Sequence, residues 1–386
     1  MDVPVYKKLD EILSEVKTLT RGSYTNVFQI VAAIRRGNLI PNGTEFVLPH
    51  SVYGDILCVT RARNMHKLAV DPNAPTVTFQ PKYLLSSNGG SSAATFQYDR
   101  PEAMFAALTE AIPSGTVVKF TATAYGGWTA GDRHFTASEN LPVGTMLCIN
   151  GYQNTALESL SVQAFADQKA TTAFATMPIV AGDGDATVDL GAWETDGNHP
   201  QRISYGSNND AESNFFQFLN GDSGSGYMSS IFVPKTKYDM MTSSFNSLKG
   251  FLGGFSDEVR DCLGLTKIHN ITNTVFESQD SAYTKNTEYT YNGYFFLPSR
   301  KEVYGSNENA HEDSEVQFDY YKEIATADHD KLMYAEKATS PTTYWLRTPH
   351  AGHASSVRIC YTGYDGALNT SSAYYSYGAA PLGILA

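Results

Sequence analysis

Three copies of one short motif, Ile/Leu-Pro-x-Gly-Thr, most strongly constrain the fold of this chain, because each copy leads directly into an apolar stretch. The copies occupy residues 40–44, 112–116 and 141–145. Proline at the second position and glycine at the fourth suit a type I turn that begins a strand. The first two copies follow apolar stretches predicted to be helical, 27–34 and 103–111. The motif therefore predicts short strands and a duplicated helix–turn–strand unit.

The other predicted elements follow from hydrophobic periodicity and from the turn residues between them. Helices are expected at 24–36, from Ser213 to Asn220, and through Phe245 to Leu252. Strands are expected at 45–48, 56–61, 76–79, 116–121, 146–149, 160–164, 294–297, 343–346 and 356–361. This mixture of many short strands and few helices predicts an α+β fold.

The N-terminal residues 5–20 are predicted to form an amphipathic helix whose apolar residues alternate in steps of four and three, as in the seam of a coiled coil. Two heptads are too short to hold helices together unaided, because helix nucleation is costly. The seam is expected to be one part of a larger contact between copies of the chain. The alternative is a helix that packs on its own domain. The seam residues are Val5, Leu9, Ile12, Val16 and Leu19.

Composition argues against several classes of protein. The chain has 386 residues and a formal net charge of −12, so a polyanion would be repelled and nucleic-acid binding is not expected. Its hydrophobic content of 42% is that of a globular protein. No apolar run approaches the length of a membrane span, and the four cysteines are widely spaced. We therefore expect no membrane insertion, no disulfide framework, and no metal or cofactor.

The C-terminal segment 346–386 has a composition of its own. After Trp345 the chain contains no Lys, Glu, Gln, Met or Trp, and it is rich in Tyr, Ser, Ala, Thr and Gly. An asparagine codon whose two adenines are varied encodes every type found there and none of the five that are absent. The pattern predicts deliberate diversification, and hence recognition. The alternative is a run of strands and turns that lacks long side chains by chance.

Three sequence landmarks occur in order in the second half of the chain. They are YGSN at 205–208 with FLN at 218–220, then GYFFLPS at 293–299, then YWLRTP at 344–349. This order resembles the C-type-lectin-like domain of variable proteins that are diversified by retroelements, especially gut-microbial and phage members. The resemblance covers about half of the chain. It implies a C-type-lectin-like fold that holds a mutable surface at its end.

The resemblance also implies a non-enzymatic protein that binds a ligand or the surface of another cell. Phage members resemble receptor-binding tips of tail or head fibres and are often trimeric, whereas bacterial members are surface-displayed and usually carry an export signal. Because the first residues here lack the apolar core of a signal peptide, we expect a virion protein that recognises a bacterial surface protein or glycan. It would be a homo-oligomer, with a trimer favoured, joined to other virion proteins through its N-terminus. A structural or decoration protein of the virion and a bacterial surface-displayed protein are the alternatives.

The tail is expected to divide into scaffold and surface positions. Trp345 should anchor a buried strand, Arg347 should bond backbone carbonyls or a carboxylate beneath the loop, and Gly366 should adopt positive φ in a tight turn. Tyrosine with serine and asparagine is also typical of antibody paratopes, because tyrosine offers a large amphipathic area at little entropic cost. For any single tyrosine, half-buried packing is the alternative. The expected ligand-binding, variable positions are His350, His353, Ser355, Ser356, Tyr361, Tyr364, Asp365, Asn369, Thr370, Ser371, Ser372, Tyr374, Tyr375 and Tyr377.

The chain lacks the common catalytic motifs. The sequence contains no nucleophile elbow, Walker loop, dinucleotide fingerprint or zinc-protease helix, and no catalytic residue is predicted. The nearest acidic cluster would suit a glycan-active enzyme, but a charged helix explains it better. It consists of Asp313, Glu315, Asp319 and Glu323. The predicted domains are N-terminal helices at 1–39, a β-rich platform at 40–135, and a C-type-lectin-like domain at 136–386 with its variable tail at 346–386.

Overall fold

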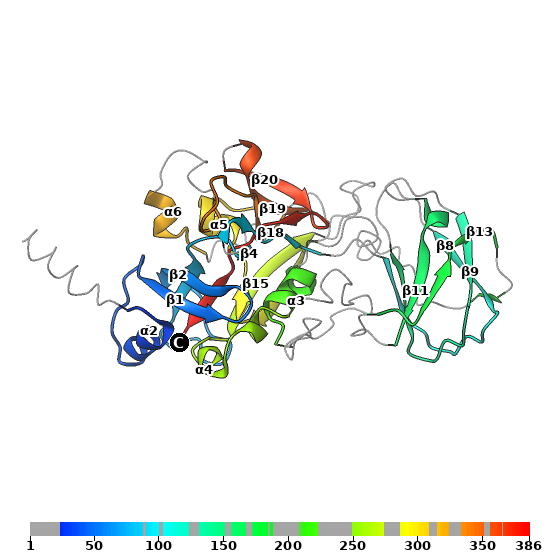
Figure 1. Ribbon diagram of the computed structural model, residues 1–386, viewed down its shortest axis with the longest axis horizontal. Coiled ribbons are helices and arrows are strands. Elements are labelled where there is room, and N and C mark those ends of the chain that lie inside the picture. The colour runs from blue at the N-terminus through cyan, green and yellow to red at the C-terminus, as the bar shows by residue number, and fades with distance from the viewer. Residues whose placement is uncertain are drawn as a thin grey trace, which may run out of the picture.

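The chain forms two bodies that lie side by side in the computed structural model, a larger one and a smaller β-sandwich (Figure 1). Most elements are short strands in several small sheets with few helices, so the predicted α+β class is confirmed. None of the described helices is long and apolar enough to cross a membrane. The residues that the structure describes are 24–87, 90–99, 103–122, 131–150, 156–166, 172–183, 186–187, 208, 210–222, 249–273, 286–308, 315–323, 333–350, 356–364 and 366–386.

A five-stranded antiparallel sheet forms the centre of the larger body and joins distant parts of the chain. Its last strand in sequence lies between two strands that come from much earlier positions. The order across the sheet is β1 (Glu45–His50), β2 (Gly54–Arg63), β3 (Val77–Pro81), β22 (Leu382–Leu385) and β17 (Phe295–Phe296). Every residue of β22 is buried. The end of the tail is therefore part of the hydrophobic core.

Three short α-helices pack around this sheet. Helix α2 (Val27–Arg35) begins after Asn26, whose side chain accepts a hydrogen bond from the N–H of the third helical residue. Helix α3 (Asn214–Leu219) begins in the same way after Ser213, and all six of its residues are buried. Both helices were predicted from the sequence at these places. The third, α4 (Asp257–Arg260), follows a 3₁₀ turn. Of the predicted helix through 245–252, residues 245–248 lie outside the described chain.

The remaining strands of the larger body form small sheets on the same core. The three-stranded sheet contains β18 (Tyr344–Pro349), β19 (Ser356–Tyr361) and β20 (Ala367–Ser372). The strand pairs are β15 (Thr266–Asn273) with β16 (Asn286–Gly293), β21 (Ser376–Tyr377) with β6 (Phe96–Gln97), and β4 (Ser86–Ser87) with β5 (Ser92–Ala93). The other helical elements described in this body are α5 (Arg300–Tyr304), α6 (Asp319–Glu323) and 3₁₀ turns at Asp210–Glu212, Leu252–Gly254 and Thr362–Tyr364, whereas the 3₁₀ turn at Leu157–Ser159 belongs to the smaller body.

The smaller body is a sandwich of two four-stranded sheets with a hydrophobic core of its own. Val118, Phe135, Leu147 and Val162 come from both sheets and are fully buried in that core. One sheet has the order β12 (Ala175–Pro178), β11 (Ser161–Phe165), β10 (Met146–Asn150), β7 (Ala103–Ala107). The other has the order β13 (Val180–Ala181), β9 (Gly131–Thr136), β8 (Val117–Ala122), β14 (Ala186–Thr187).

The three copies of the turn motif form the same hydrogen bonds. In each copy the threonine N–H donates to the proline carbonyl, at 3.4, 3.2 and 3.1 Å, and the glycine has φ of +82°, +86° and +86°. Proline is therefore the first residue of the turn and glycine the third, where a type II turn requires positive φ; the expected type I turn was wrong. Each copy also exchanges two backbone hydrogen bonds with one residue in or directly after a neighbouring strand, namely Thr60 in β2, Ala137 after β9 and Leu108 after β7.

Two expectations about organisation need correction. The stretch expected as a helix at 103–111 begins with strand β7, because its backbone pairs with β10. The predicted boundary at 135/136 falls inside β9, and Phe135 of this strand shares one core with Leu147 of β10. The strands of 45–81 instead complete the sheet that contains β22 and β17. The sandwich is thus an insertion in the chain of the larger body, rather than part of an N-terminal platform.

Candidate ligand-binding surface

Strand β18 is the foundation of the predicted surface, and all six of its residues are buried. Its Trp345 is fully buried, and the indole Nε1–H donates to the carbonyl oxygen of Phe96 at 2.8 Å. The Trp345 backbone N–H donates to the carbonyl oxygen of Gly378 at 3.0 Å. The indole therefore ties the strand to β6, and its backbone ties the strand to the chain after β21. The scaffold role predicted for Trp345 agrees with this geometry.

The Arg347 guanidinium is buried beneath the three-stranded sheet. It donates to the carbonyl oxygen of Leu297 at 2.7 Å, to both carboxylate oxygens of Glu302 at 2.7 and 3.2 Å, and to Glu315. Glu302 Oε1 also forms a hydrogen bond with His66 Nε2 at 2.7 Å. Burial by itself would raise the pKa of Glu302, but the charges and hydrogen bonds of Arg347 and His66 outweigh burial and lower it to about 2. Arg347 thus bonds a carbonyl and carboxylates, as the sequence predicted.

Above this foundation, β19 and β20 form an antiparallel pair whose turn depends on Gly366. This glycine has φ of +87°, in agreement with the prediction, and its N–H donates to the Tyr361 carbonyl at 2.9 Å. The carbonyl of Gly366 in turn accepts the hydroxyl of Tyr304 at 2.6 Å. Backbone bonds and a side chain from α5 therefore fix the turn in place.

We expect Gly366→Ala to destabilise the protein by about 1–2 kcal/mol, because an L-residue in the left-handed region brings its Cβ close to the following carbonyl oxygen. Gly366→Asn should cost less, since asparagine visits this region more readily. Chemical denaturation of both variants checks the prediction. Equal losses for the two substitutions would contradict it.

The two faces of β19 are held in different ways. Val357 and Ile359 are buried in the core of the larger body, and Cys360 is buried in the cluster on the opposite side. On the latter side, Arg358 donates to both carboxylate oxygens of Glu308 at 2.6 Å, and Arg300 binds the same carboxylate. Arg358 is thus a fixed position inside the tail, which the sequence did not single out.

Three tyrosines form a continuous aromatic stack that runs from the buried strand to the surface. Tyr377 meets Trp345 edge-on, with ring centroids 4.9 Å apart. Tyr375 lies 6.3 Å from Tyr377, and Tyr374 lies 4.3 Å from Tyr375. The Tyr375 side chain is 47% exposed. The stack therefore carries aromatic area from a rigid core residue out to solvent.

The backbone that carries this stack is held mainly by residues outside the tail. Strand β21 pairs with β6, with Ser376 opposite Gln97 and Tyr377 opposite Phe96. The Gln97 side-chain amide donates to the Tyr374 carbonyl at 2.8 Å. A hydroxyl–hydroxyl hydrogen bond of 3.0 Å joins Ser371 and Tyr377. Sequence analysis did not identify β6 as a support, because Phe96 and Gln97 are far from the tail in sequence.

The structure brings most of the predicted variable positions onto the three-stranded sheet and the turns around it. Half-buried on these elements are His350, Ser356, Tyr361, Asn369, Thr370, Ser371, Ser372, Tyr374 and Tyr377, whereas Tyr375 is exposed. Tyr361 and Tyr377 also pack against the core. Outside the described residues lie His353, Ser355, Asp365, the side chain of Tyr364 and the proposed oligomerisation residues Val5, Leu9, Ile12, Val16 and Leu19.

The acidic cluster considered for catalysis is not gathered around one space in the described chain. Glu315 is bound to Arg347 and to the Ser299 hydroxyl, and Asp319 pairs with Lys322 at 3.0 Å on α6. Asp313 and the side chain of Glu323 lie outside the described residues. The two carboxylates that can be described therefore have structural partners.

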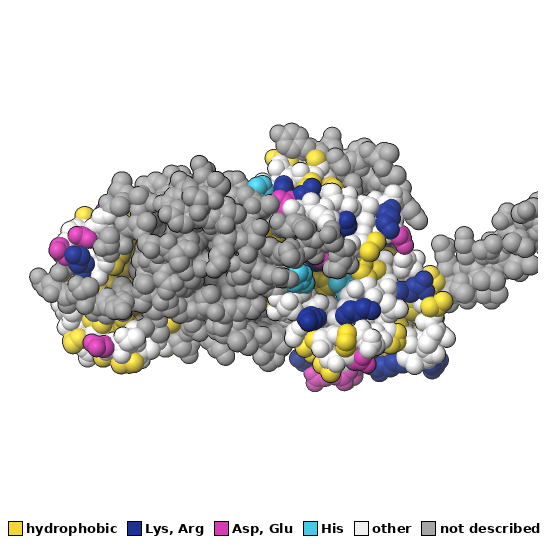
Figure 2. Space-filling view, turned by 180° about the vertical axis from the view of Figure 1, so that it is seen from behind, with side chains coloured by type: hydrophobic (Ala, Val, Ile, Leu, Met, Phe, Trp, Pro, Cys, Tyr) yellow, Lys and Arg dark blue, Asp and Glu magenta, His cyan; other side chains and the backbone are white. Residues whose placement is uncertain are grey.

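Charge on the larger body is mixed rather than uniform. On the face shown in Figure 2, the described Lys and Arg side chains are scattered among hydrophobic and uncharged ones, and acidic side chains gather at the lower edge. The net charge of −12 therefore does not form one continuous acidic patch on the part of this face that the structure describes.

Comparison with known proteins places the chain within a family. No curated protein and no solved structure matches the chain. The family described as "Domain of unknown function (DUF6273)" matches residues 188–386, which begin directly after the last strand of the sandwich. The match includes β15 to β22, but the sheet containing β22 is completed by β1 to β3 from outside it. The matched region covers more than half of the chain, so the chain belongs to the DUF6273 family.

Proposed function

We propose that this protein is a non-enzymatic binding protein of the retroelement-diversified, C-type-lectin-like type, which recognises a bacterial surface protein or glycan. The observation that carries the proposal is the stack of Tyr374, Tyr375 and Tyr377, which is based on buried Trp345 and includes the exposed ring of Tyr375. Rigid aromatic area beside adaptable hydroxyls is the usual source of binding energy in paratopes and interface hot spots.

The support of the tail explains how its side chains can be exchanged without loss of the fold. Its backbone is fixed by pairing with strand β6, by the Gln97 side chain and by the Tyr304 hydroxyl. These three partners lie outside residues 346–386. The buried positions of the tail, such as Ile359 and those of β22, supply the core instead. The exposed and half-buried polar positions between them do not have to fill the hydrophobic core. This division favours recognition over a purely structural role.

The wider assignment follows the order of the three landmarks in the fold. Residues 218–220 end helix α3, residues 293–299 contain β17, and residues 344–349 are β18. In this proposal the domain is C-type-lectin-like and belongs to a phage fibre or tip, where a homo-oligomer attaches to other virion proteins through its N-terminus. Display on a bacterial surface and a decoration role in the virion are the competing assignments.

Sequencing the gene from sibling isolates tests the proposal at the level of diversification. We expect substitutions to concentrate at the half-buried and exposed tail positions and to spare Trp345, Arg347, Gly366 and β22, because these four fix the scaffold. An adenine-rich near-copy of the tail's coding sequence beside the gene would support the mechanism. A tail that is invariant among isolates would favour the decoration role instead.

The double substitution Tyr374→Ala and Tyr375→Ala is expected to abolish most binding to susceptible bacterial cells while leaving the melting temperature nearly unchanged. Removal of a hot-spot tyrosine costs about 2 kcal/mol or more in binding. Tyr375 is exposed and Tyr374 is half-buried, so their rings should contribute little to folding. Flow cytometry with the labelled protein measures binding, and calorimetry measures stability. Tyr377 is less suitable for this test, because it packs on Trp345 and supports the core.

Tyr334→Ala is the matched control, since Tyr334 is a 40% exposed tyrosine that lies outside the tail. It should change neither binding nor stability. If the double variant binds cells as well as Tyr334→Ala does, or if it unfolds, the tyrosine stack is not the recognition surface.

A further inference from the structure

A hollow lies where β2 and the chain after β3 separate. The Lys82 N–H donates to the Leu57 carbonyl at 2.8 Å, in line with the β2–β3 ladder. Beyond this bond the chain turns away, because the N–H of Leu84 donates to the Tyr334 carbonyl and that of Leu85 to the Ala379 carbonyl. The space left beside β2 has a volume of about 410 Å³, within the range of about 300–1,000 Å³ usual for ligand sites.

The base and one wall of this hollow are apolar and rigid. Leu84 and Leu85 are buried at 2% and 3% exposure and contribute to its base. Tyr53 forms the wall, and its ring is held from behind by His50, at 5.0 Å between centroids, and Phe251, at 5.8 Å. Burial raises the pKa of Tyr53. Its ring is therefore a fixed aromatic platform whose hydroxyl stays protonated.

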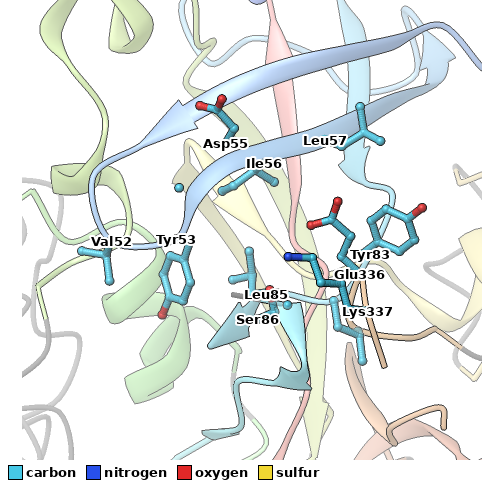
Figure 3. A pocket seen from close by; sticks show the side chains of 13 residues that line it. Val52, Tyr53, Asp55, Ile56, Leu57, Tyr83, Leu85, Ser86, Glu336 and Lys337 are labelled. Carbon is cyan, nitrogen blue, oxygen red and sulfur yellow. The ribbon is translucent and has the colours of Figure 1, made fainter. Parts of the chain in front are cut away.

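The opposite wall carries charged groups of both signs. Glu336 and Lys337 extend from the segment that precedes β18, and Figure 3 shows the Lys337 amine directed into the space between Tyr53 and Glu336. Asp55 lies on the rim, on β2, with its carboxylate directed away from Tyr53 and Lys337 (Figure 3). All three side chains are exposed, and among the described residues none of them forms an ion pair. Hydrogen-bonding capacity is thus available on one side of the hollow and an aromatic face on the other.

This combination restricts the chemistry of a ligand. An anion would meet two carboxylates, a dication would meet the Lys337 ammonium, and an apolar molecule would desolvate all three charged groups without replacing their hydrogen bonds. A neutral polyhydroxylated ring avoids each of these costs. Its C–H face can lie on the tyrosine, while its hydroxyls donate to Glu336 and accept from Lys337.

We propose that the hollow between Tyr53 and Glu336–Lys337 binds one neutral sugar unit of a glycan. None of its lining residues belongs to 346–386, so this site would stay constant while the tail varies. The protein would then combine a fixed sugar-binding subsite with an exchangeable surface. The subsite does not depend on the tail's being diversified, and its test is separate from that of the tyrosine stack.

Saturation-transfer NMR on the full chain tests the proposal, with glucose, galactose, mannose and N-acetylglucosamine each used as a probe. At least one of these neutral sugars should receive saturation. Lys337→Ala and Glu336→Gln should each weaken its binding about ten-fold, the effect of losing one charge-assisted hydrogen bond. Both residues are exposed, so these variants are expected to fold. Calorimetry is the measurement that checks their folding.

Two controls make the outcome decisive. Lys267→Ala removes an exposed lysine on β15, away from the hollow, and should leave sugar binding unchanged. The double substitution of Tyr374 and Tyr375 should also leave it unchanged, which separates this site from the recognition surface. The proposal is overturned if no neutral sugar binds, if both hollow variants bind as the wild type does, or if an acidic sugar such as N-acetylneuraminic acid binds more tightly than all four probes.

Discussion

Arg347→Met is expected to lower the free energy of unfolding by about 3–5 kcal/mol, because it leaves a buried carboxylate without its main partner. Glu302 is fully buried and receives two hydrogen bonds from Arg347, at 2.7 and 3.2 Å. Methionine fills similar space but supplies neither charge nor donor. Urea denaturation at neutral pH measures the loss. Arg260→Met, which removes an exposed ion pair to Asp257 on α4, is the control and should cost less than about 1 kcal/mol.

The pH dependence gives this prediction a second, independent readout. In the wild type the pKa of Glu302 is lowered from 4.5 to about 2, so its contribution to stability is present above pH 4.5 and is lost as the pH falls towards 2. Without Arg347 only His66 remains as its charged partner, and burial should raise the pKa above its ordinary value. The variant should then lose stability as the pH rises. Parallel stability curves for the two proteins between about pH 4 and pH 7 would contradict the assignment.

Trp345→Ala is expected to cost about 3–5 kcal/mol as well, since it opens a large cavity beneath the tail. The ring contacts Tyr98 at 5.3 Å and Tyr377 at 4.9 Å between centroids, and no part of it is exposed to solvent. Loss of the ring removes the base of the tyrosine stack, so binding should fall together with stability. Calorimetry and the cell-binding assay measure the two effects on the same samples.

Trp345→Phe separates packing from hydrogen bonding at this position. Phenylalanine keeps most of the aromatic contact but cannot donate to the Phe96 carbonyl, which the indole Nε1 reaches at 2.8 Å. We expect a smaller loss, of about 1–3 kcal/mol, set by the unsatisfied carbonyl and the reduced volume. If Trp345→Ala were no worse than Trp345→Phe, the indole would not be the foundation that its burial indicates.

The tyrosine stack and the sugar-binding hollow would serve recognition differently. The stack presents side chains on a backbone that residues outside the tail hold in place, such as Gln97 and Tyr304. The hollow is built from β2 and from the segments before β4 and β18. A fixed weak site beside a variable one could raise the effective concentration of a cell surface for the variable site. Affinity for cells would then fall on loss of either site.

The sequence alone determined the local elements of this protein. Asn26 and Ser213 cap helices where they were expected, the proline–glycine motifs begin β1, β8 and β10, and Gly366 has positive φ. It also predicted that Trp345 anchors a buried strand, which is β18. Each of these features depends on neighbours in sequence or on hydrophobic pattern, which is why they could be predicted.

Only the tertiary structure decided which segments meet. Strand β22 pairs with β3 across some 300 residues, β6 supports β21, and the apolar stretch at 103–107 forms a strand because β10 is beside it. The hydrogen bonds of Arg347 and the hollow beside Tyr53 also arise from contacts between segments that are distant in sequence. Such contacts gain their free energy from burial between distant segments, and neither local propensity nor periodicity specifies the partner.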